Sequence, residues 1–278
     1  MERHPYISAS IVVYDSPTRE VREAVDCLKA DGVDCIYLIC NGPAASRITP
    51  EAFPEATILA TENRGYGAGH NIAMRESLKN GSKYHLVLNA DVSWQPCAVR
   101  AMIEFMDGRP DVSLVSPKTF YPDGEIQHTC RMLPTPFDMF IRLTTPEWMF
   151  SGRKKRYLLA AKDSDKALDV PYILGCFMLF RTDALRRHGL FDERFFMYPE
   201  DIDITRRIHC GGEKTLYWPG ATIIHHHCRA SRHSLRMMMV HIRNMARYFN
   251  KWGWLCDPER KRANRCVMKA IQSQVSRE

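Results

Sequence analysis

Two short acidic elements in the sequence have residue types that could do chemistry. The first is Asn89-Ala90-Asp91, which directly follows an apolar run. A carboxylate at such a strand end can hold a divalent cation that bridges a diphosphate, because hard cations prefer oxygen ligands. The structural alternative is an Asx-type turn.

The second acidic element is the run Glu200-Asp201-Ile202-Asp203, between an aromatic stretch and a predicted helix at 202–210. Burial and like charge both raise the pKa of neighbouring carboxyl groups, which suits a general base. The structural alternative is a helix start at which acids complement the dipole. Asp203 fits that alternative best, so Glu200 and Asp201 are the stronger active-site candidates.

Glycine and histidine supply two further patterns. The run GYGAG at 65–69 opens a predicted helix, where glycines permit close backbone approach and the helix start favours anions. It lacks the lysine of a P-loop and departs from GxGxxG, so a tight turn is an equal alternative. The run His225-His226-His227 ends a predicted strand, where 225 and 227 share a face. One of these two could complete a metal site begun by Asp91, although histidines at such positions also simply pack.

Alternating strand and helix patterns predict the scaffold that positions these residues. Strands are expected at 7–13, 35–39, 57–60, 84–88 and 112–115, with helices between them, including 69–79 and 96–106. This order predicts βαβ units and a mainly parallel sheet. Ligands of such sheets bind outside the carboxyl ends of the strands, where the polar residues occur. Sequence order therefore gathers the candidates along one rim.

The second half of the chain has a weaker pattern. A loop-rich or partly helical excursion is expected at 120–170, followed by strands at 172–180, 216–218 and 221–224, the last two split by Pro219-Gly220. A helix is predicted at 234–249, and the basic tail after it is expected to fray.

Composition sets broader bounds. The length of 278 residues suits one α/β domain with an appendage, or two small domains. Hydrophobic residues make up 45% and charged residues 26%, which is typical of a folded protein. No apolar run is long enough to span a bilayer and no signal-peptide core is present, so a cytoplasmic location is expected. The ten cysteines form no CxxC pair, and we expect them to be reduced and mostly buried. The net charge of +7 suits nucleic acid, an anionic membrane, a phosphorylated substrate or a solvated face.

Five segments occur in a characteristic order between about residues 7 and 250. They are IVVYDS, NRGYGAGHNIAM, LVLNADV, ILGCFMLFRTDALRRHGLFDERFFMYPEDIDITRRI, and PGATIIHHH followed by HIRNMARYF. Together they resemble the family 2 glycosyltransferases of bacteria, in particular the rhamnosyltransferase-like members that build O-antigen and other surface polysaccharides. The resemblance implies a GT-A type α/β fold, with a mainly parallel central sheet flanked by helices and a C-terminal helical extension. It implies a catalytic domain at 1–230, with a nucleotide-binding half at about 1–115 and an acceptor half at about 116–230, before a basic extension at 231–278.

The resemblance also implies roles for residues at matching positions. Asp91 and His225 would hold Mg²⁺ or Mn²⁺, Asp201 would be the catalytic base, and Glu200 would hold donor or acceptor hydroxyls. The remaining donor-site residues are Tyr14, Asp15, Asn41, Arg64, Gly65, Gly67, Asn89, Asp91, Gly175 and Cys176. Asn89 replaces the first aspartate of the family's DxD-like motif. Cys40 stands where an aspartate is common, which leaves the choice of nucleotide open.

The implied function is inverting, metal-dependent transfer of a sugar from a nucleotide-sugar to a hydroxyl of a glycan or polyprenyl-diphosphate-linked acceptor. Rhamnose from dTDP-rhamnose is the first expectation. Peripheral membrane contact is a second hypothesis for the basic C-terminal part, which contains Arg243, Arg247 and Lys251 beside Met239, Ile242, Phe249, Trp252 and Trp254. Packing of that helix on the domain is the alternative.

Three other functions are weaker alternatives. A nucleotidyltransferase would need a basic glycine-rich loop near the N-terminus, which IVVYDSPTRE does not provide. A catalytically inactive binding protein of the same fold would be expected to lack the acidic elements, yet Asp91 and Asp201 are present. Nucleic-acid binding rests on charge alone and is not expected.

Overall fold

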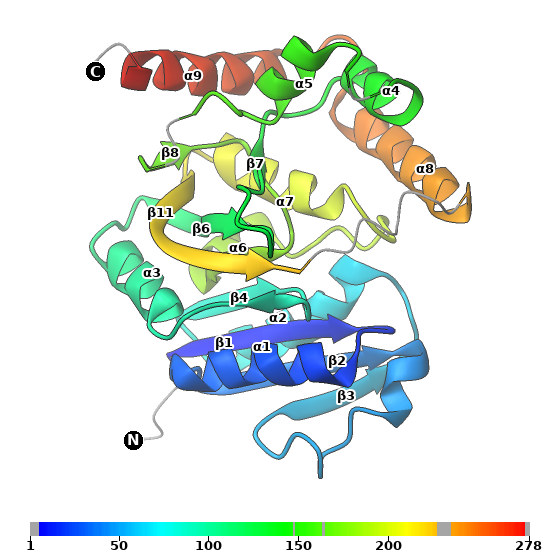
Figure 1. The fold of residues 1–278 in the computed structure, drawn as a ribbon, viewed down its shortest axis with the longest axis vertical. Helices are drawn as coiled ribbons and strands as arrows, with labels where there is room; N and C mark the ends of the chain where they lie inside the picture. The colour runs from blue at the N-terminus through cyan, green and yellow to red at the C-terminus, as the bar shows by residue number, and fades with distance from the viewer. Residues whose placement is uncertain (1–5, 147, 163–164, 227–234, 276–278) are drawn as a thin grey trace.

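The computed structural model describes residues 6–146, 148–162, 165–226 and 235–275. A central sheet runs through the molecule in the strand order β3-β2-β1-β4-β10-β6-β11-β5, with β8 also paired to β11 (Figure 1). The strands are β1 (Ile7–Val13), β2 (Cys35–Asn41), β3 (Thr57–Thr61), β4 (Tyr84–Leu88), β5 (Val92–Ser93), β6 (Val112–Phe120), β8 (Leu168–Asp169), β10 (Phe177–Arg181) and β11 (Lys214–His225). A separate pair joins β7 (Cys130–Arg131) to β9 (Tyr172–Ile173).

The sheet is parallel in its first part and mixed in its second. Strands β3, β2, β1 and β4 run parallel, as the alternating pattern predicts. Strand β10 is antiparallel to both β4 and β6, whereas β11 runs parallel to β6. The mainly parallel α/β class is therefore confirmed, with β10 as a reversed strand in the middle of the sheet.

Residue alternation along the strands assigns a helix layer to each face. On β1, Ile7, Ala9, Ile11 and Val13 face a core shared with α1 (Thr18–Ala30) and α3 (Ala98–Asp107). Helices α2 (Tyr66–Lys79), α6 (Thr182–His188) and α7 (Glu200–Cys210) cover the opposite face. Because side chains alternate between faces, each strand contributes to both layers.

A buried polar chain lies under α2 on that second face. The Ser10 hydroxyl contacts His70 Nδ1 at 2.7 Å and His85 Nε2 at 2.9 Å. Ser8 contacts the other nitrogen of His85 at 2.8 Å, and Ser77 on α2 at 2.7 Å. Burial lowers the pKa of His85 to about 3, so this histidine is neutral near pH 7.

Four helices gather at the end of the molecule opposite β3 (Figure 1). They are α4 (Pro136–Thr144), α5 (Ser151–Tyr157), α8 (Leu235–Trp252) and α9 (Pro258–Val275). The expected fraying of the tail is wrong for α9, in which Ala263, Val267 and Ile271 form a buried stripe. Asn264 also exchanges two hydrogen bonds with the backbone of Leu133. Arg260 is buried, whereas the other basic residues of α9 are exposed. The four-residue spacing of the apolar side chains attaches the helix to the second core.

Three other expectations need correction. The strand expected at 172–180 is divided into β9 and β10 by a loop at 174–176. The two strands expected around Pro219-Gly220 form one strand, β11, with an irregularity between Trp218 and Thr222. Of the nine cysteines described, all free, only Cys40, Cys130 and Cys176 are buried, so burial of most of them was wrong. Within the described ranges no helix has the length and apolar character to cross a bilayer.

Candidate active site

The strand register brings the polar ends of several strands to one rim. Val13 of β1 is level with Cys40 of β2, and Ile11 is level with Leu88 of β4, so Tyr14, Asn41 and Asn89 follow on the same edge. Because β10 runs the other way, the residue before it, Cys176, lies beside the end of β4. The Asn89 N–H donates to the Cys176 carbonyl at 3.0 Å.

Tyr66, the first residue of α2, joins the two sides of this rim. Its hydroxyl lies 2.7 Å from the Gly175 carbonyl and 3.1 Å from Asn89 Oδ1. Sequence reasoning missed Tyr66, although it stands between two glycines that were singled out. Its partners are more than twenty and more than a hundred residues away, and no local pattern indicates them.

Asp91 and His225 form the predicted pair. Asp91 Oδ1 lies 3.3 Å from His225 Nε2, and the Asp91 carbonyl accepts from the His226 N–H at 2.8 Å. The imidazole is buried, and Gln127 Oε1 lies 2.8 Å from its Nδ1. Burial on its own lowers the pKa of His225, but neighbouring Cys176 and Asp91 outweigh it and raise the pKa to about 10. The antiparallel pairing of β11 with β5 sets this geometry.

This pair fits part of a divalent cation site. Two ligand atoms at about 2.1 Å from one ion and at right angles lie about 3 Å apart, close to the 3.3 Å separation of the Asp91 and His225 atoms. Gln127 accepting from Nδ1–H would leave Nε2 as the ligand atom. Among the residues the structure describes, no group of three or more His, Cys, Asp or Glu could hold a metal ion. His227, the alternative ligand, lies outside the described residues.

Asp201 is buried at the start of α7, where backbone donors hold both of its oxygens. Oδ1 accepts from the Ile202 N–H at 2.7 Å, and Oδ2 accepts from the Gly175 N–H at 3.0 Å. The Tyr172 hydroxyl lies 3.4 Å from Oδ2. Burial raises the pKa of Asp201 to about 6, and these donors together with Arg131 limit the rise.

Glu200 differs from its neighbour. It is 3% exposed, and its Oε2 has no hydrogen-bond partner among the described residues. Burial, followed by the charge of Asp201, raises the pKa of Glu200 well above its usual value. The two adjacent carboxyl groups therefore have different surroundings, and Glu200 holds its proton more tightly than a solvent-exposed glutamate does.

The peptide group of Gly175 links the acidic centre, which consists of Glu200 and Asp201, to the rim. Its N–H donates to Asp201, while its carbonyl accepts from Tyr66, which also contacts Asn89. A methyl group at residue 175 would lie 3.4 Å from the Tyr66 ring and 3.5 Å from Asp201 Cβ. The structure thus brings together Asn89, Asp91, Gly175, Cys176, Asp201 and His225 from four separate segments.

The glycines of the 65–69 loop make room for the chain itself. Gly65 has φ 105°, and a Cβ there would collide with the Phe196 carbonyl. The Tyr66 N–H donates to that same carbonyl at 2.9 Å. A Cβ at Gly67 would lie 2.8 Å from Phe191. The close backbone approach predicted for a ligand is thus made by protein atoms, which set the position of Tyr66.

The other predicted donor residues lie further along the rim. Tyr14 is 51% exposed and packs against Gly42, the first residue of the short 3₁₀ helix η1 (Gly42–Ser46). Asp15 forms an ion pair with Arg47 at 3.1 Å. Asn41 is buried, and its Oδ1 has no partner within the part of the chain described. Arg64 is exposed and lies 3.7 Å from Glu193. Their contact with a donor stays a prediction.

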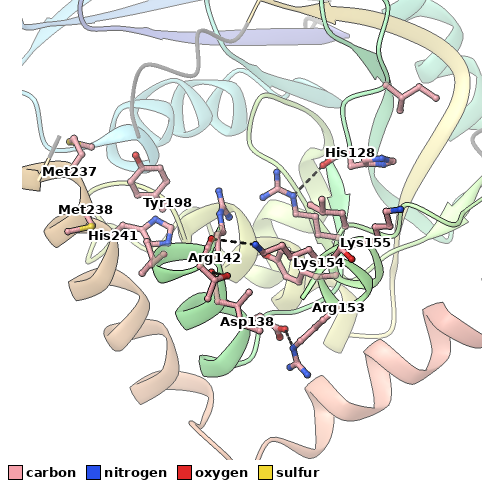
Figure 2. Close-up of a pocket in the computed structure, with 18 of the residues that line it drawn as sticks. His128, Asp138, Arg142, Arg153, Lys154, Lys155, Tyr198, Met237, Met238 and His241 are labelled. Atoms are coloured by element: carbon pink, nitrogen blue, oxygen red, sulfur yellow. Dashed lines mark hydrogen bonds and ion pairs between the residues drawn. The ribbon is translucent and has the colours of Figure 1, made fainter. Parts of the chain in front are cut away.

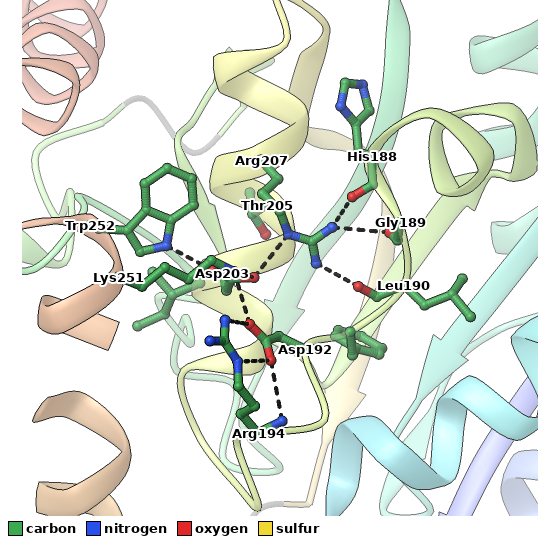
Figure 3. Close-up of polar contacts among 12 residues, drawn as sticks. His188, Gly189, Leu190, Asp192, Arg194, Asp203, Thr205, Arg207, Lys251 and Trp252 are labelled. Atoms are coloured by element: carbon green, nitrogen blue, oxygen red, sulfur yellow. Dashed lines mark hydrogen bonds and ion pairs between the residues drawn. The ribbon is translucent and has the colours of Figure 1, made fainter. Parts of the chain in front are cut away.

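Asp203 has a structural role (Figure 3). Its fully buried carboxylate accepts from Arg207 Nε at 2.9 Å, Lys251 Nζ at 2.7 Å and Trp252 Nε1 at 2.7 Å. Lys251 also contacts Asp192 at 2.9 Å. These contacts join α7, which carries Asp201, to the C-terminal end of α8.

The same contacts reduce the number of α8 residues that are available to a membrane. Phe249 is buried, while Lys251 and Trp252 are bonded to Asp203, so packing accounts for these residues. Arg247 donates to the Arg194 carbonyl. Met239 and Ile242 remain exposed at 68% and 48%, and Trp254 at 46%.

Comparison with known proteins decides the family. The model for "Glycosyl transferase family 2" matches residues 11–189, more than half of the chain. The chain belongs to glycosyl transferase family 2. The match covers the rim and β10 and ends before α7, so Asp201 and His225 lie outside it.

Two curated relatives of this glycosyltransferase are named as rhamnosyltransferases. The N-acetylglucosaminyl-diphospho-decaprenol L-rhamnosyltransferase of Mycobacterium tuberculosis is 28% identical over 192 residues, which is 64% of this chain and 62% of that protein. The rhamnosyltransferase WbbL of Escherichia coli is 27% identical over 193 residues, 66% of this chain and 69% of the relative. The aligned part thus spans about three fifths of the mycobacterial protein.

Solved structures place the family 2 chain among the GT-A glycosyltransferases. GalNAc-T7 with UDP, GalNAc and Mn²⁺ has a TM-score of 0.56 at 13% identity, covering 81% of this chain and 44% of that one. The mannosyltransferase PcManGT of Pyrobaculum calidifontis with GDP-Man and Mn²⁺ has a TM-score of 0.53 at 15% identity, covering 98% and 76%. At these identities the likeness supports the fold, and the expected GT-A class is confirmed.

Proposed function

We propose that this glycosyltransferase transfers rhamnose, with inversion, from dTDP-rhamnose to a hydroxyl of a glycan or polyprenyl-diphosphate-linked acceptor. The names of the mycobacterial and Escherichia coli relatives support the sugar, and the mycobacterial name supports a lipid diphosphate acceptor. The 1–115 and 116–230 halves would serve donor and acceptor respectively. Peripheral membrane contact through the C-terminal part remains part of the proposal.

The observation that carries the proposal is the setting of Asp201. Its carboxylate is buried and fixed by two backbone N–H groups, and its pKa, raised by burial to about 6, leaves it ionised at neutral pH. It is linked through Gly175 and Tyr66 to the Asn89–Asp91 end of β4. Asp201 can thus accept a proton, and it lies near a rim that suits a diphosphate. This arrangement fits direct displacement at the anomeric carbon of the sugar.

In this mechanism Asp201 takes the proton from the acceptor hydroxyl as that oxygen attacks the anomeric carbon. Burial raises the pKa of Glu200 well above its usual value, and in its protonated form this carboxyl would donate a hydrogen bond to a sugar hydroxyl. Tyr66 fixes the position of Gly175 and hence of the carboxylate. General base catalysis of this kind contributes about 10²–10⁴-fold to the rate.

Asp91 and His225 would hold Mg²⁺ or Mn²⁺, and Gln127 would orient the imidazole. A bound divalent cation would neutralise charge on the departing diphosphate. The two solved neighbours contain Mn²⁺, which supports a divalent cation here.

Donor binding tests the metal assignment. Calorimetry with a panel of nucleotide-sugars should show binding of dTDP-rhamnose that strengthens with Mn²⁺ and loses this dependence in Asp91→Ala. Asp183→Ala, an exposed carboxylate on α6, is the matched control and should bind like wild type. Absence of binding by every donor, with and without Mn²⁺, would refute the proposed function.

Transfer tests the base. Asp201→Asn should abolish rhamnosyl transfer while donor affinity survives, because an amide cannot take a proton from the acceptor hydroxyl. Turnover of this variant within about tenfold of wild type would exclude Asp201 as the base.

A further inference from the structure

A basic cavity of about 600 Å³ lies beside the acidic centre, between α4, α5 and α8 (Figure 2). Its lining includes Arg142 of α4, Lys154 and Lys155 of α5, and Met238 and His241 of α8. None of its residues was singled out for the proposed catalytic or donor site. It is large enough to take part of an extended ligand.

The charges of the lining are unbalanced. Five lining side chains are cationic, Arg131, Arg142, Arg153, Lys154 and Lys155, whereas Asp138 is the carboxylate among the lining residues. Asp138 is already paired with Arg153 at 2.6 Å. Such an excess of positive charge in a concave site attracts anions.

Two of these cations form no hydrogen bond or ion pair with the described residues of the protein. Lys154 donates to the carbonyls of Thr145 and Pro146. Arg142 and Lys155, by contrast, have no hydrogen bond or ion pair among residues 6–146, 148–162, 165–226 and 235–275. Burial, followed by the charge of Arg142, lowers the pKa of His241 to about 4, so this wall histidine is neutral. Arg142 and Lys155 are therefore available to a ligand.

The cavity adjoins the proposed base. Arg131 lines it and lies 5.8 Å from the centroid of the Tyr172 ring, whose hydroxyl lies 3.4 Å from Asp201. Tyr198 forms another part of the wall, three residues before Asp201, and has the unusual φ of 91°. Positive φ at a tyrosine is strained, so the surrounding structure must hold Tyr198 in this conformation. A ligand in the cavity would thus be separated from the carboxylate by the side chains of Arg131 and Tyr172.

An apolar surface borders the cavity. Met238, which lines it, is 39% exposed, and Met239 and Ile242 on the same helix are 68% and 48% exposed. On α4, Phe137 and Phe140 are 48% and 58% exposed. A cationic cavity next to exposed apolar side chains is complementary to a molecule with an anionic group followed by a hydrocarbon chain.

We propose that this cavity binds the diphosphate of a polyprenyl-diphosphate-linked acceptor, with Arg142 and Lys155 contacting the phosphate oxygens. The exposed apolar side chains of α8 and α4 contact the first isoprene units. This inference rests on the proposed function, which places the donor diphosphate at Asp91 and His225 instead. In this inference the cationic side chains of α4 and α5 bind the acceptor and not the donor.

Binding of farnesyl diphosphate, measured by calorimetry on the full chain, tests the inference without any donor. Arg142→Gln combined with Lys155→Gln should raise the Kd for farnesyl diphosphate by about tenfold or more, since two charge-assisted contacts are lost. The matched control, Arg156→Gln combined with Arg265→Gln, removes the same charge from exposed positions outside the cavity lining and should leave the Kd unchanged. Equal losses in the two double variants would overturn the inference, as would no binding by wild type.

Three further probes identify the ligand chemistry. Farnesol has no phosphate, so its weaker binding should be the same in wild type and the cavity variant; an equal loss for farnesol would show a merely structural role. dTDP should not displace farnesyl diphosphate, and displacement would assign the cavity to the donor. If the cavity variant lost only its binding to phosphatidylglycerol vesicles, with farnesyl diphosphate affinity intact, an anionic bilayer would be the partner and the inference would be wrong.

Transfer kinetics separate this inference from the proposed function. With a sugar linked to farnesyl diphosphate as acceptor, the cavity variant should show a higher KM for acceptor and an unchanged KM for donor. Suppose that wild type transfers no sugar, while the cavity variant still binds farnesyl diphosphate more weakly than wild type. That result would refute the proposed reaction and support the diphosphate as the ligand of the cavity. Transfer by wild type with the same acceptor KM in both double variants would refute the inference alone.

Discussion

At the scale of single residues, the site separates two adjacent carboxyl groups by their surroundings. Asp201 has backbone donors on both oxygens, whereas Glu200 Oε2 is buried without a partner among the described residues. Hydrogen bonds donated to a carboxylate favour its ionised form, whereas burial favours its neutral form. Neighbouring residues with the same chemistry can therefore act as base and as hydrogen-bond donor.

This difference predicts an acid limb in the pH profile of transfer. Asp201 must be ionised to accept a proton, and burial raises its pKa to about 6, so kcat/KM should fall as the pH drops below about 6. The fall should approach about tenfold per pH unit. Initial rates between pH 4.5 and pH 8 measure it, with donor affinity followed in parallel. A flat profile down to pH 5, with the fold intact by circular dichroism, would contradict the role of Asp201.

Sequence reasoning identified the charged candidate residues better than the neighbouring residues that position them. Asp91, Asp201 and His225 are recognisable by type and by their place at strand or helix ends. Tyr66 and Gln127 are ordinary in their local sequence, and they act on Gly175 and His225, which lie about a hundred residues away. Only the register of β4, β10 and β11 brings these side chains together.

At the scale of elements, the site depends on how α7 is held. Asp203 is 0% exposed and binds Arg207 within α7, together with Lys251 and Trp252 of α8. The acidic run at 200–203 thus has two faces, with Asp201 toward the site and Asp203 toward α8. The C-terminal helix therefore supports the position of the proposed base.

Removal of this anchor should destabilise the protein. Asp203→Ala leaves Lys251, Arg207 and the Trp252 N–H without their shared acceptor, and breaking such a buried cluster costs about 3 kcal/mol in the free energy of unfolding. Chemical denaturation measures the change. Asp183→Ala, which removes an exposed carboxylate that pairs with Arg186, should cost less than about 0.5 kcal/mol. An equal loss in the free energy of unfolding for the two variants would show that the contacts of Asp203 stabilise the protein no more than an exposed ion pair does.

Element prediction succeeded where one face is regularly apolar and failed where local signals compete. The bounds of β1 and β4 agree with expectation, because their apolar runs end at clear polar residues. Pro219-Gly220 indicated a break, but β6 pairs with β11 on both sides of it, so the strand continues with an irregularity there. The apolar stripe of α9 was hidden among basic residues, which suggested fraying.

At the scale of the whole molecule, the main surprise is the place of β10. This strand comes from the second half of the sequence, yet it lies between β4 and β6 of the first. Its Phe177 and Leu179 belong to the same core as β1 and α1. The sequence resemblance indicates the fold class, but neither periodicity nor spacing indicates that a reversed strand completes the middle of the sheet.

The expected nucleotide-binding half should therefore not fold alone. A fragment of residues 1–115 lacks β10, so β4 would keep an unpaired edge and part of the first core would be open. We expect little cooperative unfolding by circular dichroism and fast hydrogen exchange in β4. The full chain provides the reference, and a cooperative transition of the fragment with slow exchange in β4 would contradict this expectation.

The position of β10 also has a consequence during protein synthesis. Strands β1 to β4 are complete once residue 88 has been made, whereas their next neighbour ends at residue 181. At ordinary elongation rates the edge of β4 stays open for on the order of ten seconds. An open apolar strand edge is a template for pairing with other chains. Slow codons between β4 and β10 should therefore lower the yield of folded enzyme, whereas slow codons after β10 should not.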